Sequence, residues 1–192
     1  MIFNPQLVNS IHGHLERNEI EMLYRYASQV APGSEIVEIG SYQGRSTVLL
    51  AKGAQAASAA RVWAVDSFND QSGFMHTTLD DRAQLLANLT IHGVVGIVEI
   101  ITGASVEVAA EWGEYFSAHP ISLLFIDASH LYKDVKADFE AWSPFVKGFI
   151  ALHDTTGNYP GVKQFVDELL AAGEWQVIER ADSMAVLERV NG

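Results

Sequence analysis

The 192-residue sequence contains no cysteine, which excludes disulfide bonds, thiolate nucleophiles and cysteine-ligated zinc or iron–sulfur sites. Histidine, aspartate and glutamate are the strong metal ligands that remain. The sequence has no run of about 20 apolar residues, so we expect no membrane-spanning helix. The first ten residues contain no basic segment followed by an apolar run, and we therefore expect a soluble, cytoplasmic protein without a targeting peptide.

Basic residues are also scarce, with 12 Lys and Arg against 24 Asp and Glu and a formal net charge of −12. A nucleic-acid-binding protein normally has a basic surface that releases counterions, so this charge argues against a nucleic-acid partner. The hydrophobic fraction of 48% is ordinary for a folded core. We expect one domain, with a helical segment at 1–33 and a core at 34–192.

Short β-rich segments alternate with helical segments along the core. This alternation predicts a parallel sheet covered by helices on both faces. The last two β-rich segments are joined by a link too short for a helix, which predicts an antiparallel hairpin. We therefore expect an α/β, Rossmann-like fold with a seven-stranded, mostly parallel sheet. The expected strands are 35–39, 61–65, 96–101, 121–126, 149–152, 175–179 and 184–188, and the expected helices are 46–57, 81–91, 105–116, 132–142 and 161–171, after a leading helix capped by Asn18 and Glu21.

Ligands in such sheets bind beyond the carboxyl ends of the strands, which makes the residues there candidates for a site. The first strand continues into the turn Glu-Ile-Gly-Ser-Tyr-Gln-Gly at 38–44, whose glycines permit a tight turn and a close approach to a ligand. The second strand ends in Asp66, a carboxylate suited to the hydroxyls of a ribose. A plain tight turn is the alternative interpretation of the glycines, but their combination with Glu38 and Asp66 favours ligand binding.

The turn at 38–44, Asp66 and the terminal hairpin resemble the class I S-adenosylmethionine (SAM)-dependent methyltransferases. The segment Phe-Ile-Asp-Ala-Ser-His-Leu-Tyr at 125–132 and Leu-His-Asp at 152–154 are similar to those of the methyltransferase domain 24 family. The resemblance covers residues 35–190 and implies the Rossmann-like class I methyltransferase fold. It also implies transfer of a methyl group from SAM to a small molecule, at a hydroxyl oxygen.

The resemblance also implies which residues bind the cofactor. Gly40, Ser41 and Gly44 would approach the methionine part, and Glu38 would hold the turn or the amino group. Asp66 would bind the ribose. The other cofactor contacts that it implies are Ser67, Phe68 at the adenine edge, the turn Gly103, Ala104 and Ser105, and Asp127.

The reaction centre is expected at two neighbouring strand ends, where Asp127 ends the fourth strand and Asp154 ends the fifth. Converging carboxylates repel one another, and a divalent cation would relieve this conflict. Oxygen ligands favour Mg²⁺ or Ca²⁺ over Zn²⁺. The resemblance adds Thr155 as a third ligand, although metal-dependent relatives have Asp or Asn there. Sites with and without a metal both stay open.

His130 and His153 flank the same region, and either could act as general base for an acceptor hydroxyl, because imidazole titrates near neutrality. The alternative is that one of them only binds backbone in a packed strand end. Asp127 is the third catalytic candidate. The N-terminal segment with His12 and His14, and a lid at 67–79, would determine the acceptor.

Two other functions stay open. Asp66 would also suit the ribose of NAD, but the missing third glycine of the dinucleotide motif and the closing hairpin argue against an NAD-dependent oxidoreductase. A non-catalytic cofactor-binding or assembly subunit would explain Ser129, where relatives often have Asp, and Thr155, where metal-dependent relatives have Asp or Asn. A homo-oligomer is compatible with the sequence.

Overall fold

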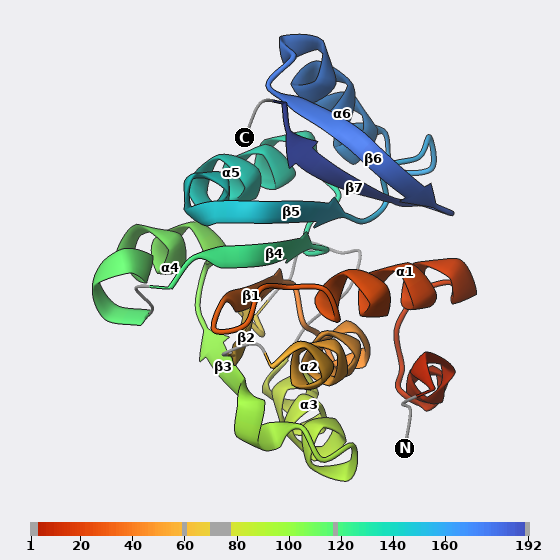
Figure 1. Cartoon of the computed structure of the whole chain (residues 1–192), viewed down its shortest axis with the longest axis vertical. Helices are drawn as coiled ribbons and strands as arrows, with labels where there is room; N and C mark the ends of the chain where they lie inside the picture. Colours follow the sequence, from red (N-terminus) through yellow and green to blue (C-terminus); the bar gives the residue numbers. More distant parts are fainter. Residues whose placement is uncertain (1–3, 59–60, 70–77, 117–118, 191–192) are drawn as a thin grey trace.

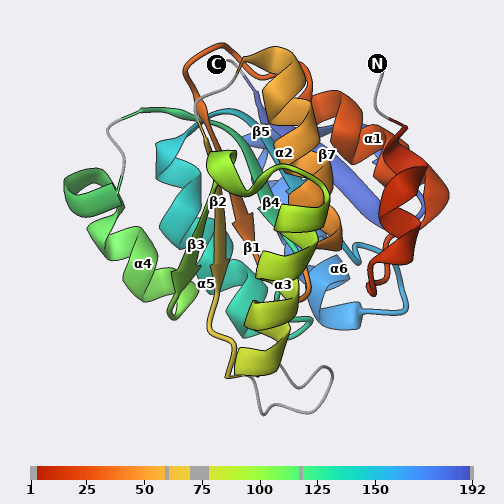
Figure 2. The same ribbon diagram turned by 90° about the horizontal axis from the view of Figure 1, so that it is seen from below.

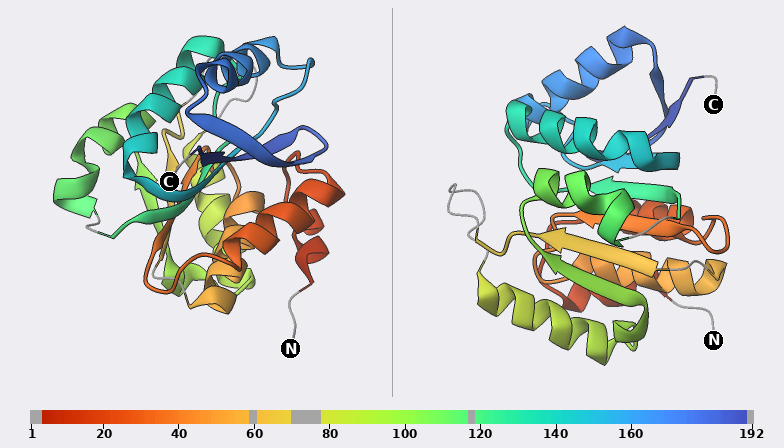
Figure 3. Two further views of the ribbon diagram at one scale, coloured as in Figure 1. Left: turned by 45° about the horizontal axis from the view of Figure 1, so that its top comes forward. Right: turned by 90° about the vertical axis from the view of Figure 1, so that its left-hand side faces the viewer.

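The computed structural model describes residues 4–58, 61–69, 78–116 and 119–190 and contains a seven-stranded sheet in the order β3-β2-β1-β4-β5-β7-β6 (Figure 1). Strands β1 to β5 are parallel, whereas β7 is antiparallel to both β5 and β6. The predicted hairpin is present at the sheet edge opposite β3 (Figure 3). The strands are β1 Glu35–Ile39, β2 Arg61–Asp66, β3 Val98–Thr102, β4 Ile121–Ile126, β5 Val146–Leu152, β6 Trp175–Ala181 and β7 Met184–Arg189.

Helices cover both faces of the sheet, as predicted (Figure 2). One hydrophobic cluster joins α1, α2 and α3 to the sheet, and a second cluster joins α4, α5 and α6 to the opposite face. Among the described residues, none of the helices combines the length and hydrophobicity needed to cross a membrane. The α-helices are α1 Arg17–Ala27, α2 Arg45–Ala57, α3 Leu79–Ile91, α4 Ser105–Glu111, α5 Tyr132–Trp142 and α6 Pro160–Ala172, and the shorter helical turns are η1 Pro5–Ser10, η2 Val95–Ile97, η3 Trp112–Phe116 and η4 Ser143–Phe145.

The predicted cap of the leading helix is wrong. Helix α1 begins at Arg17 and is capped by Glu16 together with Glu19, not by Asn18 with Glu21. The Glu19 carboxylate accepts a hydrogen bond from Glu16 N at 2.8 Å. The other boundary differences are smaller: α4 ends at Glu111 and continues as a wider π-type turn, while β3 begins at Val98 and β5 at Val146.

Backbone register brings four strand ends to one edge of the sheet. Ile39 of β1 is paired with Val65 of β2 and with Ile126 of β4, and Ile126 is paired with Leu152 of β5. The residues that follow continue this alignment, because Asp127 N donates to Ile39 O at 2.9 Å. The candidate site residues therefore lie at a common carboxyl edge. Of the segment predicted to form a lid, residues 70–77 lie outside the described part of the chain.

Candidate active site

A cavity of about 670 Å³ opens at the carboxyl edge of the sheet. This volume is typical of small-molecule sites. The cavity is lined by residues that follow all five parallel strands and by four residues of the N-terminal segment. The predicted site residues among them are Gly40, Asp66, Ser67, Gly103, Ala104, Ser105, Asp127, His130, His153 and Asp154.

The turn after β1 needs glycine because it packs tightly against the protein itself. Gly40 has a φ of +89°, and a Cβ there would lie 2.5 Å from the carbonyl oxygen of Asp127. Gly44 is the N-cap of α2 with a φ of +88°, and a Cβ there would overlap Leu85. These glycines therefore permit close packing on the residues that follow β4 and on α3, while Gly40 also lines the cavity and its approach to a ligand stays a prediction.

Asp66 fixes the same turn to the end of β2. Its Oδ2 accepts hydrogen bonds from Ser41 N at 3.0 Å and from Tyr42 N at 2.9 Å. Its Oδ1 accepts from Phe68 N at 2.8 Å. The side chain of Phe68 is buried in the core on the α1–α3 face and does not line the cavity, contrary to the predicted adenine contact.

The turn also contains buried polar groups that have no partner. Glu38 is fully buried, its Oε2 accepts from Thr47 Oγ1 at 2.5 Å, and burial raises its pKa to about 8. Its carboxyl group is therefore neutral at pH 7. Among the described residues, the buried side-chain atoms without a hydrogen-bond partner are Glu38 Oε1, Ser41 Oγ and Arg45 Nε. A buried polar atom without a hydrogen-bond partner destabilises the folded protein. A bound polar ligand near the turn could provide the missing partners.

On the other side of the cavity, the turn at 103–105 starts helix α4. The Ser105 Oγ accepts a hydrogen bond from Trp142 Nε1 at 2.8 Å. Asp138 is buried beside this pair, and burial raises its pKa to about 6. The buried network fixes the position of Ser105, which could border a bound adenine.

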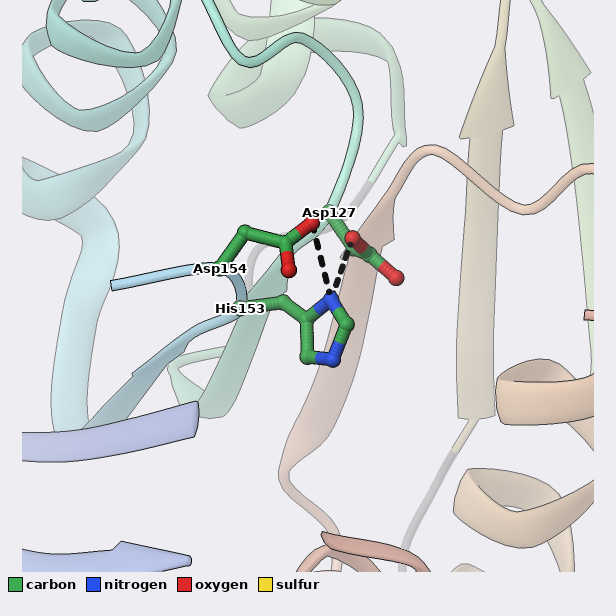
Figure 4. Close-up of side chains that lie close together, drawn as sticks. All are labelled: Asp127, His153 and Asp154. Atoms are coloured by element: carbon green, nitrogen blue, oxygen red, sulfur yellow. Dashed lines mark hydrogen bonds and ion pairs between the residues drawn. The ribbon is translucent and has the colours of Figure 1, made fainter. Parts of the chain in front are cut away.

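Asp127, His153 and Asp154 meet at the ends of β4 and β5 (Figure 4). His153 Nδ1 lies 3.0 Å from Asp127 Oδ1 and 3.3 Å from Asp154 Oδ2, and its Nε2 lies 3.1 Å from Glu19 Oε2. Burial by itself lowers the pKa of His153, but the adjacent carboxylates raise the pKa far above its usual range. The carboxylates around the ring therefore favour its charged form.

Comparison with known proteins identifies the family of this chain. A family model described as a methyltransferase domain matches residues 37–155, which is more than half of the sequence. The chain belongs to the methyltransferase domain 24 family. It is accordingly a SAM-dependent methyltransferase, and the predicted fold and enzyme class are confirmed.

Solved structures show the same methyltransferase fold. The O-methyltransferase TomG from Streptomyces achromogenes, in complex with SAM, is 14% identical, with 93% of this chain and 82% of that chain covered and a TM-score of 0.70. An O-methyltransferase from Bacillus cereus, in complex with S-adenosylhomocysteine (SAH), is 16% identical, with coverages of 96% and 87% and a TM-score of 0.69. CalS11, a TDP-rhamnose 3′-O-methyltransferase, is 21% identical, with coverages of 93% and 82% and a TM-score of 0.66.

Two of the predicted metal ligands belong to a cluster of side chains that could hold a cation. Asp127, His153 and Asp154 each place a ligand atom within 4.8 Å of the others. The predicted third ligand, Thr155, follows Asp154 directly in the chain. Its Oγ1 donates to Ser183 O at 2.8 Å and accepts from Arg180 Nη1 at 3.0 Å. The His153 Nδ1 lies between the carboxylates of Asp127 and Asp154, at 3.0 Å and 3.3 Å. The hydroxyl of Thr155 is thus already hydrogen-bonded, and its role as a metal ligand stays a prediction.

His130 lines the cavity and forms a pair with the carboxylate of Asp154. Its Nε2 lies 2.7 Å from Asp154 Oδ2, and its ring packs on Tyr159 with centroids 4.3 Å apart. Burial raises the pKa of Asp154, but the hydrogen bonds from His130 and His153 lower the pKa well below its usual range. Asp154 therefore stays ionised and orients the His130 ring, as the carboxylate does in other acid–histidine pairs.

Sequence reasoning missed two contributors to the site. Glu19 is fully buried and accepts hydrogen bonds from Ser183 N at 2.8 Å and from Ser183 Oγ at 2.7 Å, in addition to its contact with His153. Arg45 lines the cavity at the start of α2. A signal for Glu19 was present, because a glutamate in a first helical turn is typical of a cap, but its partner 134 residues away gave no local signal.

Proposed function

We propose that this methyltransferase transfers the methyl group of SAM to a hydroxyl oxygen of a small, uncharged molecule. The observation that carries the proposal is the His130–Asp154 pair, 2.7 Å apart, in the cavity that the glycine turn and Asp66 also line. A histidine oriented by a carboxylate is a suitable base for a hydroxyl proton.

The cofactor would lie across the ends of β1, β2 and β3. Gly40 and Ser41 would be next to its methionine part, Asp66 next to its ribose and the 103–105 turn next to its adenine. When bound, SAM supplies a methyl group on a positively charged sulfur, which becomes a neutral thioether after attack by the acceptor oxygen.

The residues of the chain orient the acceptor and remove its proton. His130 takes the proton of the attacking hydroxyl, and Asp154 stabilises the charged ring that results. His153 is not the base in this proposal, because carboxylates flank both of its ring nitrogens. Asp127 would face the acceptor from a position between His130 and His153. The main contribution of the protein is to hold the oxygen in line with the methyl carbon.

The charges of the cavity support an uncharged acceptor. Among its described lining residues, Arg45 is the one Lys or Arg side chain. Both of its terminal nitrogens donate to protein oxygen atoms at 2.6 to 2.8 Å, so they are already used. Because Arg45 Nε is the one guanidinium nitrogen without a partner, the cavity offers a phosphorylated acceptor little positive charge, and the net charge of −12 would repel it.

The experiment is a transfer assay with SAM against a panel of phenols, sugars and amines, using His130→Gln and the matched control His92→Gln, which lies outside the cavity lining. We expect methylation of a hydroxyl compound, with kcat reduced roughly 10²-fold or more in His130→Gln. Binding of SAH is expected to stay within about 2-fold, because His130 contacts the acceptor rather than the cofactor.

The same assay includes a chelator arm. We expect equal methyl-transfer rates in EDTA and in Mg²⁺, since in this proposal the His153 ring provides the positive charge between Asp127 and Asp154. Full activity of His130→Gln on a hydroxyl acceptor, or exclusive methylation of amines, would contradict the proposal. Methyl transfer that is lost in EDTA and recovered with Mg²⁺ would show that the reaction requires a cation.

A further inference from the structure

The N-terminal strap, which we define as residues 9–15, contributes a wall to the ligand cavity. His12, Gly13, His14 and Leu15 all line it. Ile11 and Leu15 are nearly completely buried and anchor the strap to the protein. The strap lies outside residues 37–155, the part that matches the family model. This wall is therefore a feature of the chain that the family match does not cover.

One side chain holds the strap in place. Arg45 Nη1 donates to Gly13 O at 2.6 Å, and Arg45 Nη2 donates to Leu15 O at 2.8 Å and to Asn9 Oδ1 at 2.6 Å. Hydrogen bonds from a guanidinium are stronger than neutral ones, and its planar group binds several acceptors in a fixed geometry. The contacts reach both ends of the strap and its middle.

The strap also packs closely on the glycine turn. A Cβ on Gly13 would lie 2.9 Å from Arg45 Cδ, so the strap backbone lies directly on the arginine side chain. The rings of His12 and Tyr42 make an edge contact with centroids 5.6 Å apart. Arg45 is the first residue of α2, directly after the turn that would hold the cofactor. The position of the strap is thus connected to the cofactor end of the cavity.

We propose that Arg45 is a positioning residue that holds the strap as a wall of the ligand cavity, so that ligand affinity depends on a segment outside the family match. The identity of the ligand rests on the proposed function. Without Arg45, three strap acceptors lose their donor and the wall opens to solvent.

The test compares Arg45→Met with Arg45→Lys, using calorimetric titration with SAH and amide hydrogen exchange of the ligand-free protein. In Arg45→Met we expect SAH affinity to fall by about 10-fold or more, as follows from the loss of hydrogen bonds to a charged donor. Exchange of the strap amides should rise by a similar factor, while the central strands keep their protection. Arg45→Lys should recover part of both losses. The control is Arg17→Met, whose guanidinium pairs with Glu21 on the exposed face of α1.

A second variant approaches the same contact from the strap. Gly13→Val places side-chain atoms against Arg45 without altering α2, and it should reproduce both effects. Unchanged strap exchange together with SAH affinity within 2-fold in Arg45→Met and Gly13→Val would overturn the proposal. If the wild-type protein does not bind SAH, the proposed function fails, and the exchange measurement alone then decides the role of Arg45.

Discussion

The buried carboxyl group of Glu38, at the start of the turn at 38–44, makes the stability of the folded protein depend on pH. Its pKa is raised to about 8 in the folded protein, from an ordinary value of 4.5. Between these values the folded protein keeps a proton that the unfolded chain releases. Stability therefore falls as the pH rises through this window.

Replacing Glu38 by Gln removes this titration and keeps an acceptor for Thr47. We predict that the free energy of unfolding of wild type relative to Glu38→Gln falls by roughly 2–5 kcal/mol between pH 5 and pH 8. Urea unfolding at the two pH values measures this difference, and groups common to both proteins cancel. Parallel pH dependence of wild type and variant would show that Glu38 is ionised in the folded protein.

Helix α1 is connected to the reaction centre through Glu19. This residue is 0% exposed and accepts hydrogen bonds from His153 at the end of β5 and from Ser183 between β6 and β7. The helix therefore stabilises two separate strand ends.

We predict that Glu19→Ala lowers the free energy of unfolding by about 3–5 kcal/mol, because it removes a buried carboxylate partner of His153 and the acceptor of the Ser183 N–H. The matched control is Glu21→Ala on the same helix, where an exposed ion pair is lost and the change should stay below about 1 kcal/mol. Chemical denaturation of both variants tests this. A Glu19→Ala protein as stable as the Glu21→Ala control would show that the contacts of Glu19 do not stabilise the strand ends.

The elements differ in how far the sequence could predict them. The central strand β4 is a short, largely apolar run that is buried in the sheet, so its pattern was sufficient. The cap of α1 was missed because Asn18 and Glu21 have the spacing of a capping pair. The contacts that hold Glu19 in place come from His153 and Ser183, which are far away in the sequence. The π-type turn at Trp112–Phe116 interrupts a helix whose apolar spacing gave no sign of it.

At the scale of the whole molecule, strand order explains what was predictable in the site. Because β4 and β5 are neighbours, Asp127 and Asp154 had to converge, and the structure brings them together. The way their charges are balanced was not predictable, since it depends on the orientation of His153 and on Glu19. The partner of Thr155 was not predictable for the same reason, because its hydroxyl donates to the carbonyl of Ser183, which only the fold places beside it.

The central claim is that the cavity at the carboxyl edge of the sheet binds SAM, and calorimetric titration of wild type, Asp66→Asn and the exposed control Asp80→Asn with SAM and with NAD tests it most directly. We predict one SAM site per chain, affinity reduced by about 10-fold or more in Asp66→Asn but not in Asp80→Asn, and no heat with NAD. Binding of NAD without binding of SAM, or SAM affinity equal in all three proteins, would contradict the account.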